Sequence, residues 1–159
     1  MRDAETGPGA IDRVRFGPLA DSLGFLLRLS QLRSFEGFFA EMADLDIRPG
    51  ELSVILLLAE HPGIRQGVLA ERLMIKRAHM AKMVRGLERD GLITRRVPQD
   101  DRRAMELQLT DAGRARAAAL APRLAALEAQ VPPGLTGDEA AELKRLLRKY
   151  LSPNQEADS

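Results

Sequence analysis

Hydrophobic residues in the first half of the chain recur mainly at helical spacing. Over residues 19 to about 45, apolar side chains fall three or four positions apart, which predicts one long amphipathic helix. Pro49 suits the first turn of a second helix, which runs over 51–60 and closes at Pro62. Residues 54–58 of this helix are apolar nearly all round, so we expect it to be buried among several neighbours.

Two shorter helices and a β-hairpin come next. The spacing predicts helices over about 66–73 and 76–90, with Gly91 placed to end the second one in a left-handed conformation. Residues 92–97 have the pattern of a strand, and 105–109 alternate between apolar and polar positions like a half-buried strand. A helix pair followed directly by a hairpin predicts a winged helix-turn-helix over residues 65–110.

Two more amphipathic helices close the chain. Thr110 opens the first, which Pro132 and Pro133 end, and Thr136 with Glu139 forms a capping-box pattern for the second. Their apolar faces consist of Leu120, Leu124, Leu127 and Val131, and of Leu143, Leu146, Leu147, Tyr150 and Leu151. These faces would be exposed in a monomer, so we predict an intertwined homodimer.

The predicted fold class is mainly α with a small β-hairpin wing, a winged helix-turn-helix flanked by long dimerisation helices. The expected parts are a flexible N-terminal tail over 1–15, an N-terminal dimerisation helix over 16–48, the winged helix-turn-helix DNA-binding domain over 49–110, C-terminal dimerisation helices over 111–151, and a flexible tail over 152–159.

Composition narrows the classes of function. None of the 159 residues is cysteine, which excludes disulfides, thiolate metal sites and thiol redox sensing. No apolar run approaches the roughly 18 residues of a membrane span, and the N-terminus has no signal-peptide pattern. We therefore expect a cytoplasmic protein, associated with the nucleoid when it is bound to DNA.

Positive charge is concentrated in the middle of the chain. The net charge is only +1, but residues 1–63 carry 6 basic and 10 acidic side chains, residues 64–103 carry 11 and 5, and residues 104–159 carry 7 and 8. The central segment therefore has a net charge of +6, the asymmetry expected of a phosphate-binding surface. An ordinary solvated basic face is the alternative that charge alone leaves open.

A helical wheel of residues 76–90 separates an apolar face from a cationic one. The inner face carries Met80, Met83, Val84 and Leu87, and the outer face carries Ala78, Ala81, Lys82, Arg85 and Arg89. Small residues near the N-terminal end with cations further along are what a helix entering the major groove requires.

Four sequence segments together resemble the MarR (multiple antibiotic resistance regulator) family. They are Leu69-Ala70-Glu71-Arg72-Leu73, then VRGLERDGLI over 84–93, then Asp101-Arg102-Arg103-Ala104, then Leu109-Thr110-Asp111-Ala112-Gly113. The likeness covers roughly residues 19–151. It implies a winged helix-turn-helix transcriptional regulator whose recognition helix begins near Lys76.

The resemblance also implies residue roles in binding duplex DNA. The DNA-facing residues of the recognition helix would be Arg77, Ala78, His79, Ala81, Lys82 and, from the wheel, Arg85. Arg103 would enter the minor groove, whose negative potential attracts a guanidinium, while Asp101 would orient an arginine. Phosphate contacts would come from Arg95, Arg96 and Arg102.

The start of the recognition helix departs from the family. Lys76-Arg77-Ala78-His79 replaces the usual Asp, Ser or Thr, so the helix lacks a conventional N-cap, at a cost of about 1 kcal/mol. Base preference therefore does not carry over. Gly86 inside the helix costs up to about 1 kcal/mol relative to Ala and is a candidate for close packing.

The first helix offers candidates for an effector pocket. They are Arg28, Ser30, Arg33, Phe35, Phe38, Phe39 and Met42, although such an aromatic stripe more often belongs to core or dimer packing. No cofactor or metal is expected, and no group of residues suggests catalysis.

The predicted function is a MarR-type repressor that binds pseudo-palindromic DNA as a homodimer and is released by a small molecule, such as an aromatic acid or an acyl-thioester. A protein–protein interaction module and a constitutive DNA binder are the alternatives.

Overall fold

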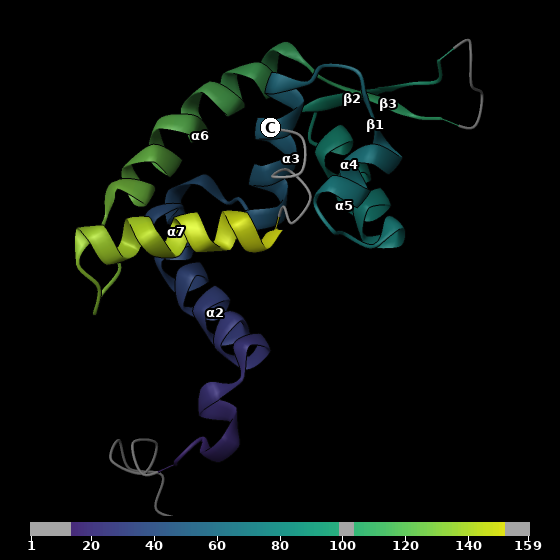
Figure 1. The fold of residues 1–159 in the computed structure, drawn as a ribbon. Coiled ribbons are helices and arrows are strands. Elements are labelled where there is room, and N and C mark those ends of the chain that lie inside the picture. The colour runs from purple at the N-terminus through teal and green to yellow at the C-terminus, as the bar shows by residue number, and fades with distance from the viewer. Residues whose placement is uncertain (1–13, 99–103, 152–159) are drawn as a thin grey trace, which may run out of the picture. The chain divides into compact units, whose positions relative to one another are not determined.

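The computed structural model describes residues 14–98 and 104–151, which form eight helical segments of three or more residues and a small sheet (Figure 1). The chain divides into two compact units, residues 1–43 and 44–159, which we describe separately. The elements in order are η1 (Gly17–Asp21), α2 (Leu23–Glu41), η2 (Ala43–Leu45), α3 (Pro49–Glu60), β1 (Ile64–Arg65), α4 (Gln66–Arg72), α5 (Arg77–Arg89), β2 (Ile93–Arg96), β3 (Glu106–Leu109), α6 (Asp111–Ala129) and α7 (Gly137–Leu151).

The first unit corrects the prediction of one continuous helix over residues 19–45. Ser22 has an extended backbone, and its hydroxyl accepts a hydrogen bond from the Phe25 N–H at 3.4 Å, which makes it the N-cap of α2. The short 3-10 helix η1 is therefore a separate element and not the first turn of α2. A second 3-10 turn, η2, follows the end of α2 at Glu41.

The core of the second unit is built around α3, which packs against both α6 and β3. The predicted burial of α3 is confirmed, since Val54 and Ile55 are fully buried and Leu58 is 1% exposed. Pro49 occupies the first turn as predicted, and the Glu51 carboxylate accepts from the Arg48 N–H at 3.0 Å. This cap fixes where α3 begins.

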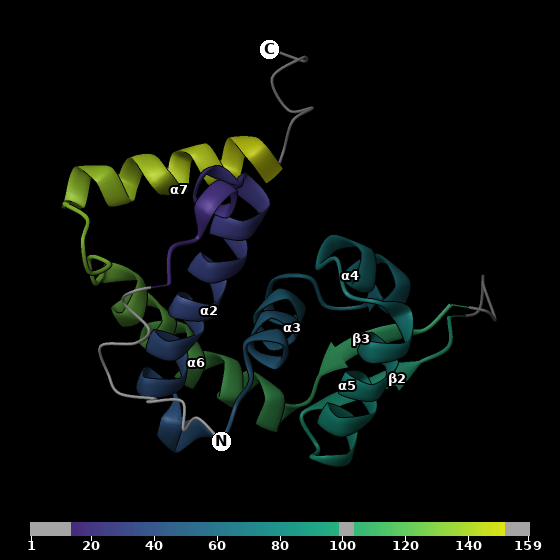
Figure 2. The ribbon, with the colours of Figure 1, turned by 90° about the horizontal axis from the view of Figure 1, so that it is seen from below.

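The predicted hairpin is confirmed, and a third strand completes an antiparallel sheet of order β1-β3-β2. Ile93 of β2 pairs with Leu109 of β3, and both side chains are buried. The additional strand β1 pairs Ile64 with Leu107 on the other side of β3. Helices α4 and α5, followed by the hairpin of β2 and β3, form a winged helix-turn-helix (Figure 2).

The last two helices follow the predicted caps. The Thr110 hydroxyl accepts from the Gly113 N–H at 3.0 Å at the start of α6. At α7, Thr136 and Glu139 exchange the two hydrogen bonds of a capping box. Lys144 joins the two helices through an ion pair of 2.7 Å with Glu128. In the described parts of the chain, no helix combines the length and apolar character needed to cross a membrane.

Candidate nucleic-acid interface

A tight turn joins α4 to α5. The Ile75 N–H donates to the Ala70 carbonyl at 2.9 Å, and Met74 adopts a left-handed backbone with φ of 53°. The Met74 side chain is 85% exposed, so nothing in the core requires a methionine there. The turn directs α5 away from α4, as a helix-turn-helix requires.

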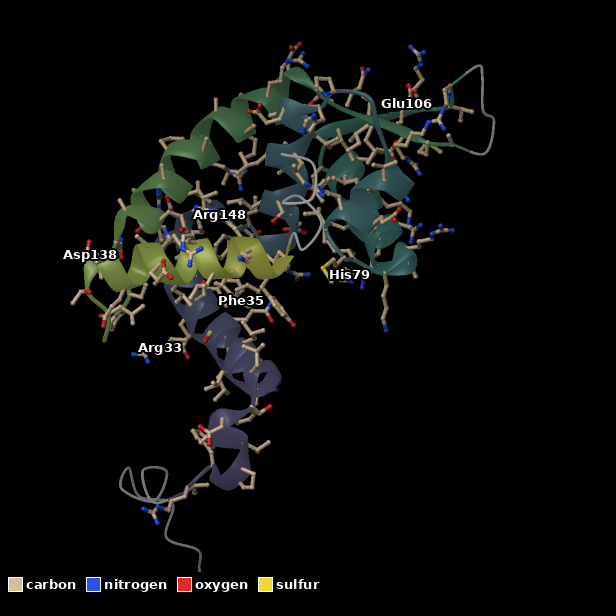
Figure 3. All side chains as sticks on the ribbon, in the orientation of Figure 1. Arg33, Phe35, His79, Glu106, Asp138 and Arg148 are labelled. Carbon is tan, nitrogen blue, oxygen red and sulfur yellow. The ribbon has the colours of Figure 1, made fainter. Side chains whose placement is uncertain are left out.

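The two faces of α5 agree with the wheel, except that Met83 of the predicted inner face is only half-buried. Met80 and Val84 are fully buried and Leu87 is 5% exposed, whereas the predicted DNA-facing side chains lie outside. The exposed set is Arg77, Ala78, His79, Lys82 and Arg85, with Ala81 half-buried. Figure 3 shows His79 near the N-terminal end of α5. Within residues 14–98 and 104–151, Lys82 and Arg85 form no ion pair, so their charges are available to an anionic partner.

One further prediction for α5 is confirmed and another is wrong. The missing N-cap is confirmed, because the Lys76 side chain forms no capping hydrogen bond. The prediction of close packing at Gly86 is wrong, since a Cβ added there would meet no atom within 4 Å. The close approach occurs instead at Gly50, where a Cβ would lie 2.9 Å from Cε of Met83.

The junction between α5 and α6 explains two of the motifs that carry the family resemblance. The Thr110 hydroxyl donates to the Gly91 carbonyl at 2.6 Å while it caps α6. A side chain at Gly113 would collide with the backbone carbonyl of Leu92. Gly91 itself has φ of 72°, as predicted for the residue that ends the helix. The LERDGLI and LTDAG segments therefore form one contact that fixes α5 relative to α6.

The wing arginines have different surroundings. Nη2 of Arg95 lies 2.5 Å from Oε2 of Glu88 on α5, and this hydrogen bond raises the pKa of Arg95. Nε of Arg96 lies 3.8 Å from the Glu106 carboxylate on β3. The predicted wing residues Asp101, Arg102 and Arg103 lie outside the described residues. A role for Glu88 was not predicted, although an acidic residue seven positions before an arginine, across a glycine turn, was a usable signal in the sequence.

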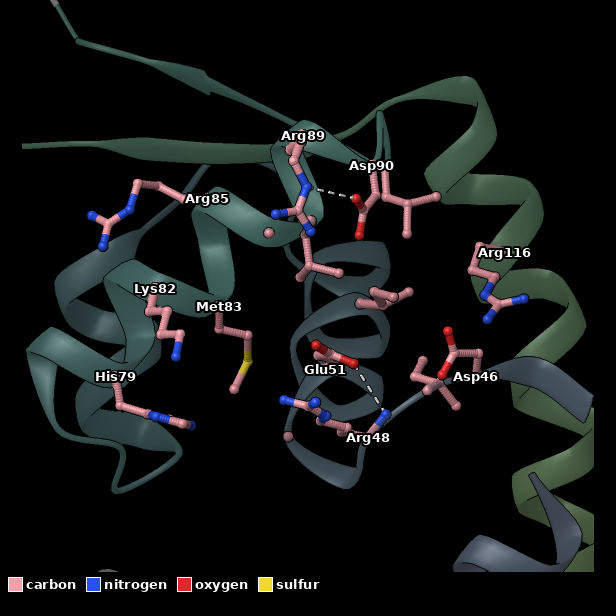
Figure 4. A pocket seen from close by; sticks show the side chains of 16 residues that line it. Asp46, Arg48, Glu51, His79, Lys82, Met83, Arg85, Arg89, Asp90 and Arg116 are labelled. Atoms are coloured by element: carbon pink, nitrogen blue, oxygen red, sulfur yellow. Dashed lines mark hydrogen bonds and ion pairs between the residues drawn. The ribbon is translucent and has the colours of Figure 1, made fainter. Parts of the chain in front are cut away.

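A pocket of about 750 Å³ opens beside α5 (Figure 4). His79, Lys82 and Met83 line it from α5, and Glu51 of α3 and Arg48, which directly precedes α3, line it as well. Its apolar lining residues include Ile47, Ile55, Leu87 and Leu92. Two of the predicted DNA-facing residues, His79 and Lys82, therefore also line a cavity large enough for a small molecule.

The residues predicted for an effector pocket on α2 are only partly brought together. Phe39 makes edge-to-face contacts with Phe35 and Phe38, at centroid distances of 6.3 and 5.6 Å. Phe38 and Met42 are buried, whereas Arg28, Ser30 and Arg33 are exposed, and Figure 3 labels Arg33 and Phe35. The pocket beside α5 is lined by other residues. The described residues contain no cluster of three His, Cys, Asp or Glu side chains suited to a metal ion.

Two arginines of α6 hold the segment that leads into α3. Arg123 forms hydrogen bonds of 2.9 and 3.1 Å with the Asp44 carboxylate, which lower the pKa of Asp44. Arg116 donates to the Leu45 carbonyl. These contacts join residues more than 70 positions apart, so no local pattern in the sequence indicated them.

The described geometry defines a winged helix-turn-helix protein with an exposed cationic recognition helix. Comparison with known proteins agrees. Residues 47–105 match the MarR family. A protein of Thauera aromatica that is named as a regulatory protein for the hcr operon is 34% identical over 98 residues, which cover 61% of this chain and 59% of that relative.

Solved structures extend the match to most of the chain. The transcriptional repressor CouR bound to a 23-mer DNA duplex is 34% identical, with a TM-score of 0.78 over 87% of this chain and 98% of that chain. CouR bound to p-coumaroyl-CoA is 32% identical, with a TM-score of 0.77 over 87% and 97% of the two chains. The chain belongs to the MarR family.

Proposed function

We propose that this chain is a transcriptional repressor that binds pseudo-palindromic duplex DNA as a homodimer and is released by a small-molecule ligand. The observation that carries the proposal is the exposed cationic face of α5, supported from beneath by a fully buried apolar face. Lys82 and Arg85 would reach base edges or phosphates, while Ala78 and Ala81 leave room for the bases. The structure of CouR bound to a DNA duplex supports this assignment.

The wing would contribute on the neighbouring groove. Arg96 is exposed on β2 and is proposed as a phosphate contact. Arg102 and Arg103 keep their predicted roles at the phosphates and in the minor groove, with Asp101 orienting an arginine. Arg95 is considered separately below because of its ion pair with Glu88.

The homodimer is proposed from the exposed apolar face of α7. Leu143, Leu146 and Tyr150 lie at helical spacing on this face and are 43%, 47% and 60% exposed. Such a contiguous face is typical of a subunit interface. A two-fold dimer would present two copies of α5 to half-sites about one helical turn apart.

Binding of the full-length protein to a fragment upstream of its own gene, followed by fluorescence anisotropy, tests the DNA-binding proposal. We expect a complex at low salt whose affinity falls steeply as salt rises, because each neutralised phosphate releases counterions. No complex at low salt would overturn the regulator and favour the rival function, a winged helix used for protein–protein assembly.

The ligand is proposed to be an aromatic acid or its acyl-thioester. The pocket beside α5 is lined by apolar residues together with Arg48 and Lys82, and CouR has been solved with p-coumaroyl-CoA. The aromatic residues of α2 are the second location. For release, the ligand must bind more tightly to the DNA-incompetent form.

Thermal-shift and DNA-release assays with p-coumarate and p-coumaroyl-CoA test the ligand proposal. An Arg48→Ala variant should lose the response if the ligand lies beside α5, whereas Arg33→Ala should lose it if the ligand lies on α2. If a wider panel of aromatic acids and thioesters neither shifts the melting temperature nor releases DNA, the constitutive DNA binder is the better description.

A further inference from the structure

The first strand of the wing carries two adjacent arginines that are not equivalent. Successive residues of a strand point to opposite faces, so Arg95 and Arg96 point away from each other. The side chains of Arg95 and Glu88 are each 34% exposed and lie within hydrogen-bond distance of each other. Arg96 is 69% exposed and has a carboxylate only at 3.8 Å.

The Glu88–Arg95 pair joins the last turn of α5 to the first strand of the wing. The intervening backbone turns at Gly91, and Leu87 and Ile93 are buried on either side of that turn. The ion pair lies nearer the surface, with both side chains partly exposed. It therefore restrains the angle between the recognition helix and β2.

That angle matters for DNA binding because the helix and the wing are proposed to reach different grooves of one duplex. A carboxylate beside Arg95 also cancels much of its positive charge and would repel an approaching phosphate. A charge-assisted hydrogen bond of 2.5 Å is a strong contact to give up. The nearby carboxylate and the existing hydrogen bond both disfavour a phosphate contact by Arg95.

We infer that Arg95 is a positioning residue that holds the wing against the recognition helix through Glu88. It does not itself bind a phosphate. This inference rests on the proposed DNA-binding function and changes the role that the sequence predicts for Arg95. It also assigns a role in DNA binding to Glu88, an acidic residue on a cationic helix.

A Glu88→Gln substitution distinguishes positioning of the wing from a phosphate contact by Arg95, because the two roles predict opposite changes in DNA affinity. If the pair positions the wing, both Glu88→Gln and Arg95→Gln weaken binding to the upstream fragment, by about fivefold, the upper range for a partly exposed ion pair. If Arg95 contacts a phosphate, Glu88→Gln strengthens binding because it removes a competing charge. Glu71→Gln, at an exposed position of α4, is the matched charge control and should not weaken binding.

A charge swap provides the rescue test. Combining Glu88→Arg with Arg95→Glu restores the pair in reverse, so we expect affinity within about twofold of the unmodified protein and a normal melting temperature. If the swapped protein binds DNA as weakly as Arg95→Glu alone, the inference is overturned. That result would mean that the positive charge of Arg95 itself contacts the DNA.

Salt dependence on a random-sequence duplex gives an independent readout. Arg95→Gln should leave the slope of log affinity against log salt unchanged, whereas loss of a phosphate contact lowers it by about 0.9. Arg96→Gln is the comparison expected to lower it. A protein that binds neither duplex would instead overturn the proposed function, and this inference with it.

Discussion

Helices α5 and α7 have the same kind of amphipathic sequence but a different fate within the chain. The apolar face of α5 is buried, with Met80 and Val84 fully covered. On α7, Leu143 and Leu146 remain 43% and 47% exposed, and Tyr150 remains 60% exposed. The apolar face of α5 is thus buried within its own unit, whereas the apolar face of α7 remains largely exposed.

This difference indicates what each helix presents to other molecules. With its apolar residues covered, α5 presents cations, which suit a polyanion such as DNA. Because α7 exposes leucines and a tyrosine, it suits another apolar surface, and a second copy of the chain would supply one. The following substitutions test this division, from the largest expected effect to the smallest.

Placing a carboxylate on each apolar face should give opposite kinds of failure. Val84→Asp buries an unpaired charge on α5 at a cost of about 3 kcal/mol or more, so we expect loss of the cooperative melting transition. Leu146→Asp on α7 should leave a helical circular dichroism spectrum but give a monomer by light scattering. A stable dimer of Leu146→Asp would contradict the assignment of α7.

The junction behind α5 should tolerate no side chain at Gly113. Gly113→Ala would push a methyl group into the Leu92 carbonyl, and we expect a loss of about 3 kcal/mol in the free energy of unfolding. Gly86→Ala is the matched control, because it lies in open space within α5 and should stabilise by up to about 1 kcal/mol. Urea denaturation of both variants measures the difference, and equal effects would contradict the described packing.

Removing one cation from each helix should distinguish the DNA-binding face. Lys82→Ala should lower affinity for the upstream fragment about tenfold and reduce the salt slope by about 0.9. Arg148→Ala removes the same charge from an exposed position on α7 and should change neither quantity. Equal losses in the two variants would show that only overall charge matters.

The cap of α7 should make a small, pH-dependent contribution to stability. Hydrogen bonds from the backbone N–H and hydroxyl of Thr136 lower the pKa of Glu139 below its ordinary value of 4.5. Because its pKa is lower in the folded state, the Glu139 carboxylate stabilises the fold at pH values above its ordinary pKa. This contribution disappears as the pH falls through the folded-state pKa. The melting temperature of Glu139→Gln should therefore lie below that of the unmodified protein at pH 7, and the gap should close in acid. A gap that persists in acid would contradict this account of the cap.

Local patterns were sufficient to predict most elements of the second unit. The period of α5 predicted the burial of Met80, Val84 and Leu87, which repeat at helical spacing, whereas Met83 of the same predicted face is half-buried and lines the pocket. Strand β1 was missed because two residues, Ile64 and Arg65, are too few to show alternation. Pairing with β3 creates that strand, and this contact spans more than 40 residues of chain.

The site was predicted less completely than the fold. Exposure of Lys82 and Arg85 followed from the wheel, but the different surroundings of Arg95 and Arg96 did not. Neighbours in the sequence looked alike, and only the approach of Glu88 to one of them separates their roles. The pocket beside α5 was also not foreseen, because α3, α5 and α6 contribute to it from three distant segments.

Hydroxyl-radical footprinting of the full-length protein on the fragment upstream of its gene tests the central claim most directly. If α5 reads DNA and α7 joins two copies, the footprint should show two protected half-sites about one helical turn apart on one face of the duplex. Leu146→Asp should lose this paired pattern. A single protected segment that Leu146→Asp leaves unchanged, or no protection at low salt, would contradict the account.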